Sequence, residues 1–179
     1  MADSLYRPAD PAGPWWNVLK TLVVVFTFWF IALFALPIGI SIVEVDLAIQ
    51  RFPGFPRLAT VLFGLFSLLG LWSALTLAIA GRGTPLPLDE TRRFVVKGPY
   101  AYVRNPLTIS ILLQGTAIAL ALGSIPVSIY VLALGAWLYF YARPREERHL
   151  KDRFGKRWSD YVKHVRAYRP RVTPYRPTS

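Results

Sequence analysis

The chain has 179 residues, of which 54% are hydrophobic and only 17% are charged. Ordinary soluble domains carry about 25% charged residues, so this composition argues against a soluble domain. The formal net charge of +11 is compatible with nucleic acid binding only if the basic residues gather on one folded surface. Cysteine is absent, and His149 and His164 lack the spacing of metal ligands on a helix, so no disulfide and no metal site are predicted.

The first part of the chain predicts a membrane anchor. Residues 1–17 form a polar leader that is broken by prolines, and two uncharged runs follow at 21–43 and 58–80. Each run is long enough for a helix that crosses a bilayer, which needs about 20 apolar residues. We expect residues 18–80 to form a two-span hairpin, with Pro37 kinking the first helix.

The third uncharged run, 107–142, is too long for a single crossing. The sequence GSIP interrupts it at residues 123–126, because Gly-Ser followed by X-Pro ends a helix. We therefore expect a helical hairpin with arms at about 107–122 and 125–142. The predicted fold is an all-α integral membrane protein with about four transmembrane helices and an amphipathic C-terminal helix.

The distribution of Lys and Arg agrees with four membrane spans. Residues 143–179 hold twelve of the 21 Lys and Arg, residues 81–106 hold five, and the two other turns between spans hold only Arg51 and Arg57. Because basic loops stay cytoplasmic, both termini and the loop 81–106 are expected inside. The charge is explained by topology and by attraction to anionic lipid headgroups, so no nucleic acid partner is predicted.

The loop 81–106 begins with GRGTPLPLDE, whose Gly and Pro residues favour irregular structure. It continues as TRRFVVKGPYAYVRNP, in which the apolar residues 94–96 must pack on a membrane-facing surface or on a bound ligand. The third helix is expected to begin at Asn105 or Pro106, since Pro suits the first helical turn. Its open backbone N–H groups would suit an oxygen-rich ligand.

The C-terminal segment predicts an amphipathic helix over residues 144–166. Its apolar residues recur every three or four positions, which describes an interfacial helix on an anionic membrane. Gly155 should bend or break this helix, and the chain past Tyr168 should be irregular. The apolar stripe consists of Leu150, Phe154, Trp158, Tyr161 and Val165.

Glu146 and Glu147 are acidic residues in the most basic part of the chain, just past the expected end of the fourth span. They could simply pair with Arg143 or Arg145. They are also the only acids beside the fourth span, on the side of the membrane predicted for residues 94–106. A cationic ligand bound there would find its counter-charge in these two residues.

Two blocks of sequence, GPYAYVRNPL and EERHLKDRFGKRWSDYVKHV, are separated by one predicted hairpin. Together they resemble the isoprenylcysteine carboxyl methyltransferase family and its phospholipid methyltransferase relatives, over about residues 88–170. The resemblance implies an S-adenosylmethionine site at the cytoplasmic ends of the last two spans within the region 81–179. It implies catalytic roles for Arg104, Asn105 and Glu147, and a cofactor site formed by Val95, Gly98, Tyr100, Asn105, Pro106, Glu146 and Glu147.

The sequence also departs from the family pattern. Thr108 replaces a usual Tyr, Ser110 replaces a usual Gly, and Arg148 and Arg166 replace common prolines. Two alternatives therefore stay open: a membrane reductase of the sterol-reductase type with a nicotinamide cofactor, and a non-catalytic scaffold that keeps the fold.

The acceptor is a further open point. An isoprenylated cysteine, a phospholipid amine, a quinone-like lipid and a small hydrophobic thiol would all fit a site that opens to the bilayer. The expected partners are thus a lipophilic or lipidated substrate and anionic membrane lipids, and the expected location is a bacterial inner membrane.

Overall fold

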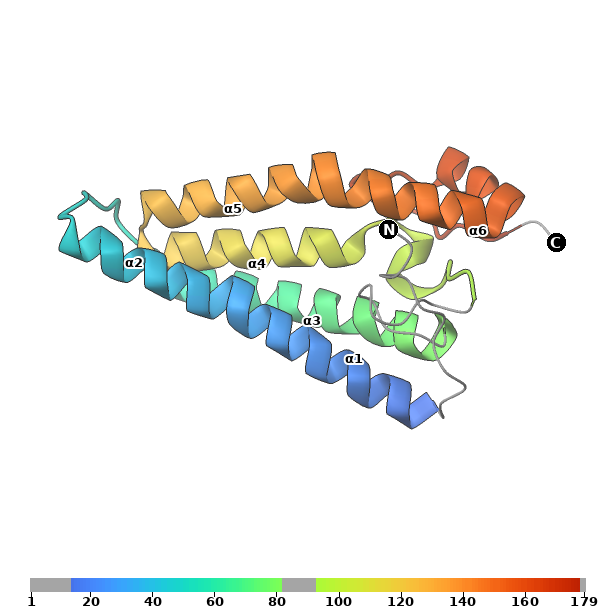
Figure 1. Cartoon of the computed structure of the whole chain (residues 1–179), viewed down its shortest axis with the longest axis horizontal. Helices are drawn as coiled ribbons and strands as arrows, with labels where there is room; N and C mark the ends of the chain where they lie inside the picture. Colours follow the sequence, from blue (N-terminus) through green and yellow to red (C-terminus); the bar gives the residue numbers. More distant parts are fainter. Residues whose placement is uncertain (1–13, 82–92, 178–179) are drawn as a thin grey trace, which may run out of the picture. The chain divides into compact units, whose positions relative to one another are not determined.

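The computed structural model describes residues 14–81 and 93–177, and every regular element in these ranges is a helix (Figure 1). Residues 1–13 of the predicted leader 1–17 and the Gly- and Pro-rich start of the loop lie outside the described residues, so the expectations for them stay predictions. The elements are α1 (Pro14–Trp29), η2 (Phe30–Ala35), α2 (Leu36–Asp46), α3 (Pro56–Gly81), η3 (Gly98–Ala101), α4 (Pro106–Leu122), α5 (Ile125–Trp137), η4 (Leu138–Ala142) and α6 (Arg143–His164). The remaining residues of that leader, 14–17, belong to helix α1.

Three continuous helical stretches among the described residues are long and apolar enough to cross a membrane: Trp15–Asp46, Pro56–Gly81 and Ile125–His164. The fourth apolar helix, α4, has 17 residues and rises about 25 Å, at the lower end of the lengths that span a bilayer. The all-helical integral membrane architecture predicted from the sequence is confirmed. In the last stretch the uncharged run ends at Ala142, so the charged helix α6 continues beyond the apolar part.

A π-helical segment directly precedes the turn that contains Pro37, where the sequence predicted a kink. Residues of η2 connect α1 to α2, and the Leu36 N–H donates to the carbonyl of Ile31, five residues back. Pro37 lies in the first turn of α2 and has no N–H to donate. The wider π turn therefore accommodates the missing donor without ending the helix.

The chain divides into two compact units, which are described separately. The first unit comprises Met1–Thr27, Leu69–Leu107 and Phe154–Ser179, and the second comprises Phe28–Leu68 and Thr108–Arg153. The first unit thus contains the segment before α4 and the second half of α6. The second contains the antiparallel α4–α5 hairpin (Figure 1).

The hairpin turn in the second unit follows the expected GSIP break. Gly123 has a φ of +62°, and a Cβ at this position would collide with the carbonyl oxygen of Phe52. The hydroxyl of Ser124 then caps α5 by accepting from the Val127 N–H at 3.1 Å. Only glycine fits this close approach, so the turn is fixed at this residue.

Small residues let the helices of the second unit approach closely. A Cβ on Gly115 of α4 would lie 3.0 Å from the Val131 side chain of α5, and one on Gly135 would lie 3.3 Å from Leu112. The Tyr130 hydroxyl of α5 donates to the Ala32 carbonyl of η2 at 2.9 Å. These contacts support the interpretation of Gly115 as an ordinary packing residue.

The C-terminal helix is broken where the sequence predicted. Gly155 has a φ of 49° and a ψ of −115°, which are not helical, and regular helix continues on both sides. No atom lies within 4 Å of the place where a Cβ would be added. Backbone conformation alone therefore requires glycine here.

Replacing Gly155 with Ala should lower the free energy of unfolding by about 1–2 kcal/mol, because an L side chain strains this left-handed conformation. Thermal unfolding of the purified protein in one detergent measures the change. Gly64→Ala is the matched control, since Gly64 lies in regular helix with equally open space and should gain stability. Equal gains for both variants would contradict the break at Gly155.

Candidate active site

Gly98 begins the 3₁₀ turn η3 in the first unit and seats that turn on α3. Its φ is +54°, and an added Cβ would lie 2.8 Å from the Thr76 hydroxyl and 3.3 Å from the Trp72 indole nitrogen. Both the conformation and the space exclude other residues. This packing explains Gly98 without a ligand, and its predicted contact with a cofactor stays a prediction.

The residues just before α4 are bonded to the chain that follows α6. The N–H groups of Arg104 and Asn105 therefore have carbonyl partners, and the open N–H groups expected at the head of α4 are restricted to its own first turn. Beyond Tyr168 the chain is irregular, as expected, but it is held in place. The four backbone bonds are Arg104–Arg166 (3.0 Å), Asn105–Ala167 (3.2 Å), Arg171–Tyr102 (3.0 Å) and Tyr175–Ala101 (2.8 Å), each named with its N–H donor first.

Phe94 packs on the apolar stripe of α6. Its ring centroid lies 5.2 Å from that of Phe154, 6.1 Å from that of Trp158 and 5.3 Å from that of Tyr161. Trp158 and Tyr161 are buried in this cluster. The sequence predicted that residues 94–96 pack on a membrane-facing surface or on a bound ligand. Phe94 needs neither of them, because α6 packs on it.

Tyr161 joins this aromatic cluster to the segment before α4. Its hydroxyl donates to the Tyr100 carbonyl at 2.6 Å. Burial raises the pKa of the Tyr161 phenol, so the group keeps the proton that it donates. The bond fixes the turn η3 against α6.

The predicted site residues of the first unit differ in accessibility. Val95, Tyr100 and Pro106 are buried, whereas Arg104 and Asn105 are partly exposed. The Arg104 guanidinium lies 5.7 Å from the centre of the Trp158 ring, a cation–π contact that holds it near the head of α4. Buried residues can form the wall of a binding site here, and the partly exposed pair can contact a ligand.

Glu146 and Glu147 lie in the second unit, in the first turns of α6. The Glu147 carboxylate accepts a hydrogen bond from Arg143 at 2.8 Å, which is the structural pairing considered from the sequence. The Glu146 side chain is exposed to solvent. Crowding by protein atoms raises the pKa of its carboxyl and the negative charge of Glu147 raises it further, but water reaching the exposed residue weakens both effects.

The hairpin of the second unit relates these acids to the head of α4. Because α4 and α5 are antiparallel, Thr108, the first α4 residue of this unit, and Arg143, the first residue of α6, lie at the same end of the hairpin (Figure 1). The predicted residues 95–106 thus lie within the first unit, and Glu146 and Glu147 lie in the second, at the end of its hairpin that contains Thr108. It does not place a ligand among them.

A family described as phospholipid methyltransferase matches residues 56–157, which is more than half of the chain. The chain belongs to the phospholipid methyltransferase family. The resemblance inferred from the two sequence blocks is thereby confirmed, and the protein is a membrane methyltransferase. No curated protein matches the chain.

Ser110 has a structural role in this family member. Its buried hydroxyl donates to the Phe66 carbonyl at 2.7 Å and accepts from the Gln114 amide at 2.6 Å. The Gln114 side-chain oxygen also accepts from Ser67 at 3.2 Å. The residue that departs from the family pattern thus joins α4 to α3. Sequence reasoning missed Gln114, whose only signal was an amide within an apolar run.

Ser110→Ala should destabilise the protein by about 1 kcal/mol, because the buried Gln114 amide loses its shortest bond. Affinity for S-adenosylmethionine should not change. Thermal unfolding and titration calorimetry check the two expectations. Thr60→Ala is the control, since that hydroxyl is exposed and bonds only within its own helix. Unchanged stability with altered ligand affinity would instead place Ser110 in the ligand site.

Tyr161→Phe should lower the free energy of unfolding by about 1 kcal/mol, because the Tyr100 carbonyl loses its partner while the ring packing stays. The comparison is with Tyr141→Phe, which removes the hydroxyl of an exposed ring and should be neutral. Thermal unfolding in the same detergent measures both variants. A neutral Tyr161→Phe would show that the bond does not hold the turn.

Proposed function

We propose that this protein transfers the methyl group of S-adenosylmethionine to an acceptor that lies in the membrane. The observation that carries the proposal is the family match across residues 56–157, which includes both the segment before α4 and the first turns of α6. Within residues 56–157, the apolar helices expose large hydrophobic side chains. An acceptor dissolved in the bilayer can therefore approach the chain.

The chemistry of the available donors and acceptors fits the cofactor. S-adenosylmethionine has an ammonium group and ribose hydroxyls, which carboxylates bind through charge-assisted hydrogen bonds. Glu146 is an exposed carboxylate, and the Glu147 carboxylate pairs with Arg143 at 2.8 Å. We assign these two residues to the polar groups of the cofactor, with Val95, Gly98 and Tyr100 forming the wall of its site.

Arg104 and Asn105 are assigned to the acceptor side. When bound, the cofactor supplies an activated methyl group on a sulfonium, and transfer requires the acceptor atom to be in line with the breaking bond. Arg104 is held by Trp158 beside the head of α4, where its guanidinium can orient an anionic acceptor group. Asn105 directly precedes Pro106, the first residue of α4, beside this guanidinium.

The acceptor is proposed only as a class: a lipophilic or lipidated molecule, as in the isoprenylcysteine carboxyl methyltransferases that the sequence resembles. We also propose that the protein lies in a bacterial inner membrane with both termini in the cytoplasm. The support is the concentration of Lys and Arg in residues 81–106 and 143–179.

Glu147→Gln should weaken S-adenosylmethionine binding by about tenfold or more, because it removes the charge that pairs with the ammonium group. Titration calorimetry of the purified protein measures the change, with reduced nicotinamide nucleotide as the control ligand. Asp160→Asn is the matched variant, since Asp160 also pairs with a basic residue, Lys163 at 3.3 Å. It should bind like the wild type.

Arg143→Gln separates the ion pair from ligand binding. If Glu147 served only its pair with Arg143, both variants would lose the same stability and neither would lose affinity. Unchanged affinity in Glu147→Gln would remove this carboxylate from the site. Binding of the nicotinamide nucleotide instead of S-adenosylmethionine would favour the reductase alternative.

A further inference from the structure

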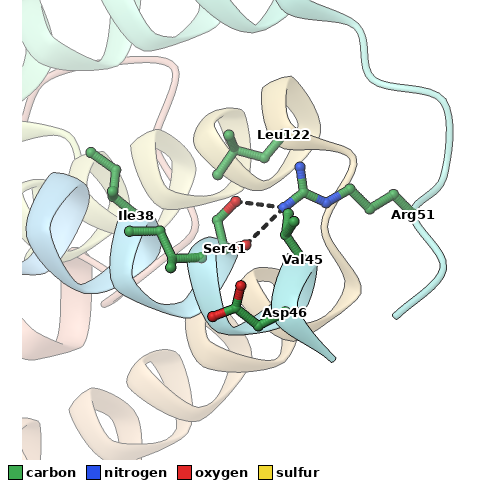
Figure 2. A pocket seen from close by; sticks show the side chains of 7 residues that line it. Ile38, Ser41, Val45, Asp46, Arg51 and Leu122 are labelled. Atoms are coloured by element: carbon green, nitrogen blue, oxygen red, sulfur yellow. Dashed lines mark hydrogen bonds between the residues drawn. The ribbon is translucent and has the colours of Figure 1, made fainter. Parts of the chain in front are cut away.

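The second unit contains a pocket of about 360 Å³ at the end of α2 (Figure 2). Its wall combines α2, the connection between α2 and α3, and the last residue of α4. The pocket lies at the turn of the α4–α5 hairpin, and α5 with η4 rises about 27 Å from there to Arg143. It is therefore separate from the head of α4. Its lining includes Ile38, Ser41, Val45, Asp46, Arg51 and Leu122.

Arg51 is held in place over this pocket. Its Nη2 donates to the carbonyl and the hydroxyl of Ser41 at 2.9 and 2.7 Å (Figure 2). The connection that carries it is bonded to the hairpin, with the Phe52 N–H donating to Gly123 at 2.9 Å and the Phe55 N–H donating to Leu120 at 3.1 Å. The guanidinium is thus ordered before any ligand binds.

The same guanidinium neutralises a buried acid and keeps donors for a ligand. Nη2 lies 3.2 Å from the carboxylate of Glu44, whose side chain has no exposed surface. In the part of the chain that the structure describes, Nε and Nη1 of Arg51 make no hydrogen bond. Both forks of a guanidinium include Nη2, so Nε and Nη1 act as separate donors, and Nη1 can bind a phosphate oxygen through one charge-assisted bond.

Asp46 gives the pocket a second, opposite charge. It is exposed and has no ion pair or hydrogen bond within the described ranges. Because Glu44 balances Arg51, the group of three charges has a net charge of −1. A ligand with a phosphate alone would meet an excess of negative charge, whereas a ligand with a phosphate and an ammonium group would match both side chains.

An apolar stripe leads from these charges along α2. Ile38, Ile42 and Val45 are spaced by four and three residues, so they share one helix face. They are 52%, 58% and 62% exposed, and within the second unit no side chain covers them fully. An acyl chain that packs on this face would shield it from the polar headgroup region.

We propose that this pocket binds one phospholipid that carries both a phosphate and a primary ammonium group. Arg51 binds the phosphate through Nη1, Asp46 accepts hydrogen bonds from the ammonium, and one acyl chain lies along Ile38, Ile42 and Val45. The lipid stabilises the α2–α3 connection. It is not the methyl acceptor, because it lies at the opposite end of the hairpin, so the proposal does not depend on the proposed function.

Native mass spectrometry of the detergent-purified protein tests this with phosphatidylethanolamine, phosphatidylcholine and phosphatidylglycerol of identical acyl chains. One phosphatidylethanolamine should bind about tenfold more tightly than either other lipid. Choline cannot donate a hydrogen bond to Asp46, and glycerol has no cation. Equal binding of all three would overturn the proposal and indicate a non-specific lipid annulus. A preference for phosphatidylglycerol would overturn it in favour of a simple anion site.

Asp46→Asn is the decisive variant, because Asp46 has no structural partner within the described residues. It should bring phosphatidylethanolamine down to the affinity of phosphatidylcholine without loss of thermal stability in lipid-free detergent. Arg51→Gln should abolish binding of all three lipids, but it also leaves Glu44 unpaired and can unfold the protein. Arg57→Gln, at an exposed residue outside the pocket lining, should behave like the wild type. An unchanged lipid preference in Asp46→Asn would refute the assignment.

Discussion

The hydrogen bond from Tyr161 to the Tyr100 carbonyl, at 2.6 Å, is the contact on which the arrangement of the first unit depends. The segment between α3 and α4 has only the short turn η3, so its polar backbone groups need partners from elsewhere. Tyr161 supplies one, and the chain after α6 supplies others through the carbonyls of Arg166 and Ala167. The head of α4 is thereby fixed to the C-terminal helix.

This constraint accounts for the residue types in the C-terminal segment. Phe154, Trp158 and Tyr161 pack around Phe94, and Trp158 also holds the guanidinium of Arg104. The break at Gly155 separates Phe154 from the later residues of the stripe. The apolar face of α6 thus positions the basic residue Arg104 beside the first residue of α4.

Several buried polar side chains of the second unit are hydrogen-bonded within that unit, as a membrane environment favours. Ser110 and Gln114 bond to α3, and Tyr130 bonds to η2. Near the turn of the α4–α5 hairpin, Arg51 neutralises the buried carboxylate of Glu44. Ser110 stands where the family usually has glycine, and its bonds give a structural reason for the exchange that does not require a loss of activity.

The sequence was sufficient to predict the helices, because hydrophobic run length, the GSIP break and Gly155 act locally. It also predicted the family, since both motif blocks are contiguous. It could not predict that Phe94 is covered by α6, or that the N–H groups of Arg104 and Asn105 are bonded to the chain after α6. Those contacts join residues about sixty positions apart, and no periodicity encodes them. The π segments likewise escaped prediction, because they have no signature beyond Pro37.

Transfer of a labelled methyl group from S-adenosylmethionine into the organic extract of membranes is the measurement that tests the central claim most directly. The account predicts label in the lipid phase that accumulates with time, depends on the protein and falls sharply in Glu147→Gln. The account would be contradicted if the label stayed at the level of membranes without the protein for all four acceptors: an isoprenylated cysteine, a phospholipid amine, a quinone-like lipid and a small hydrophobic thiol.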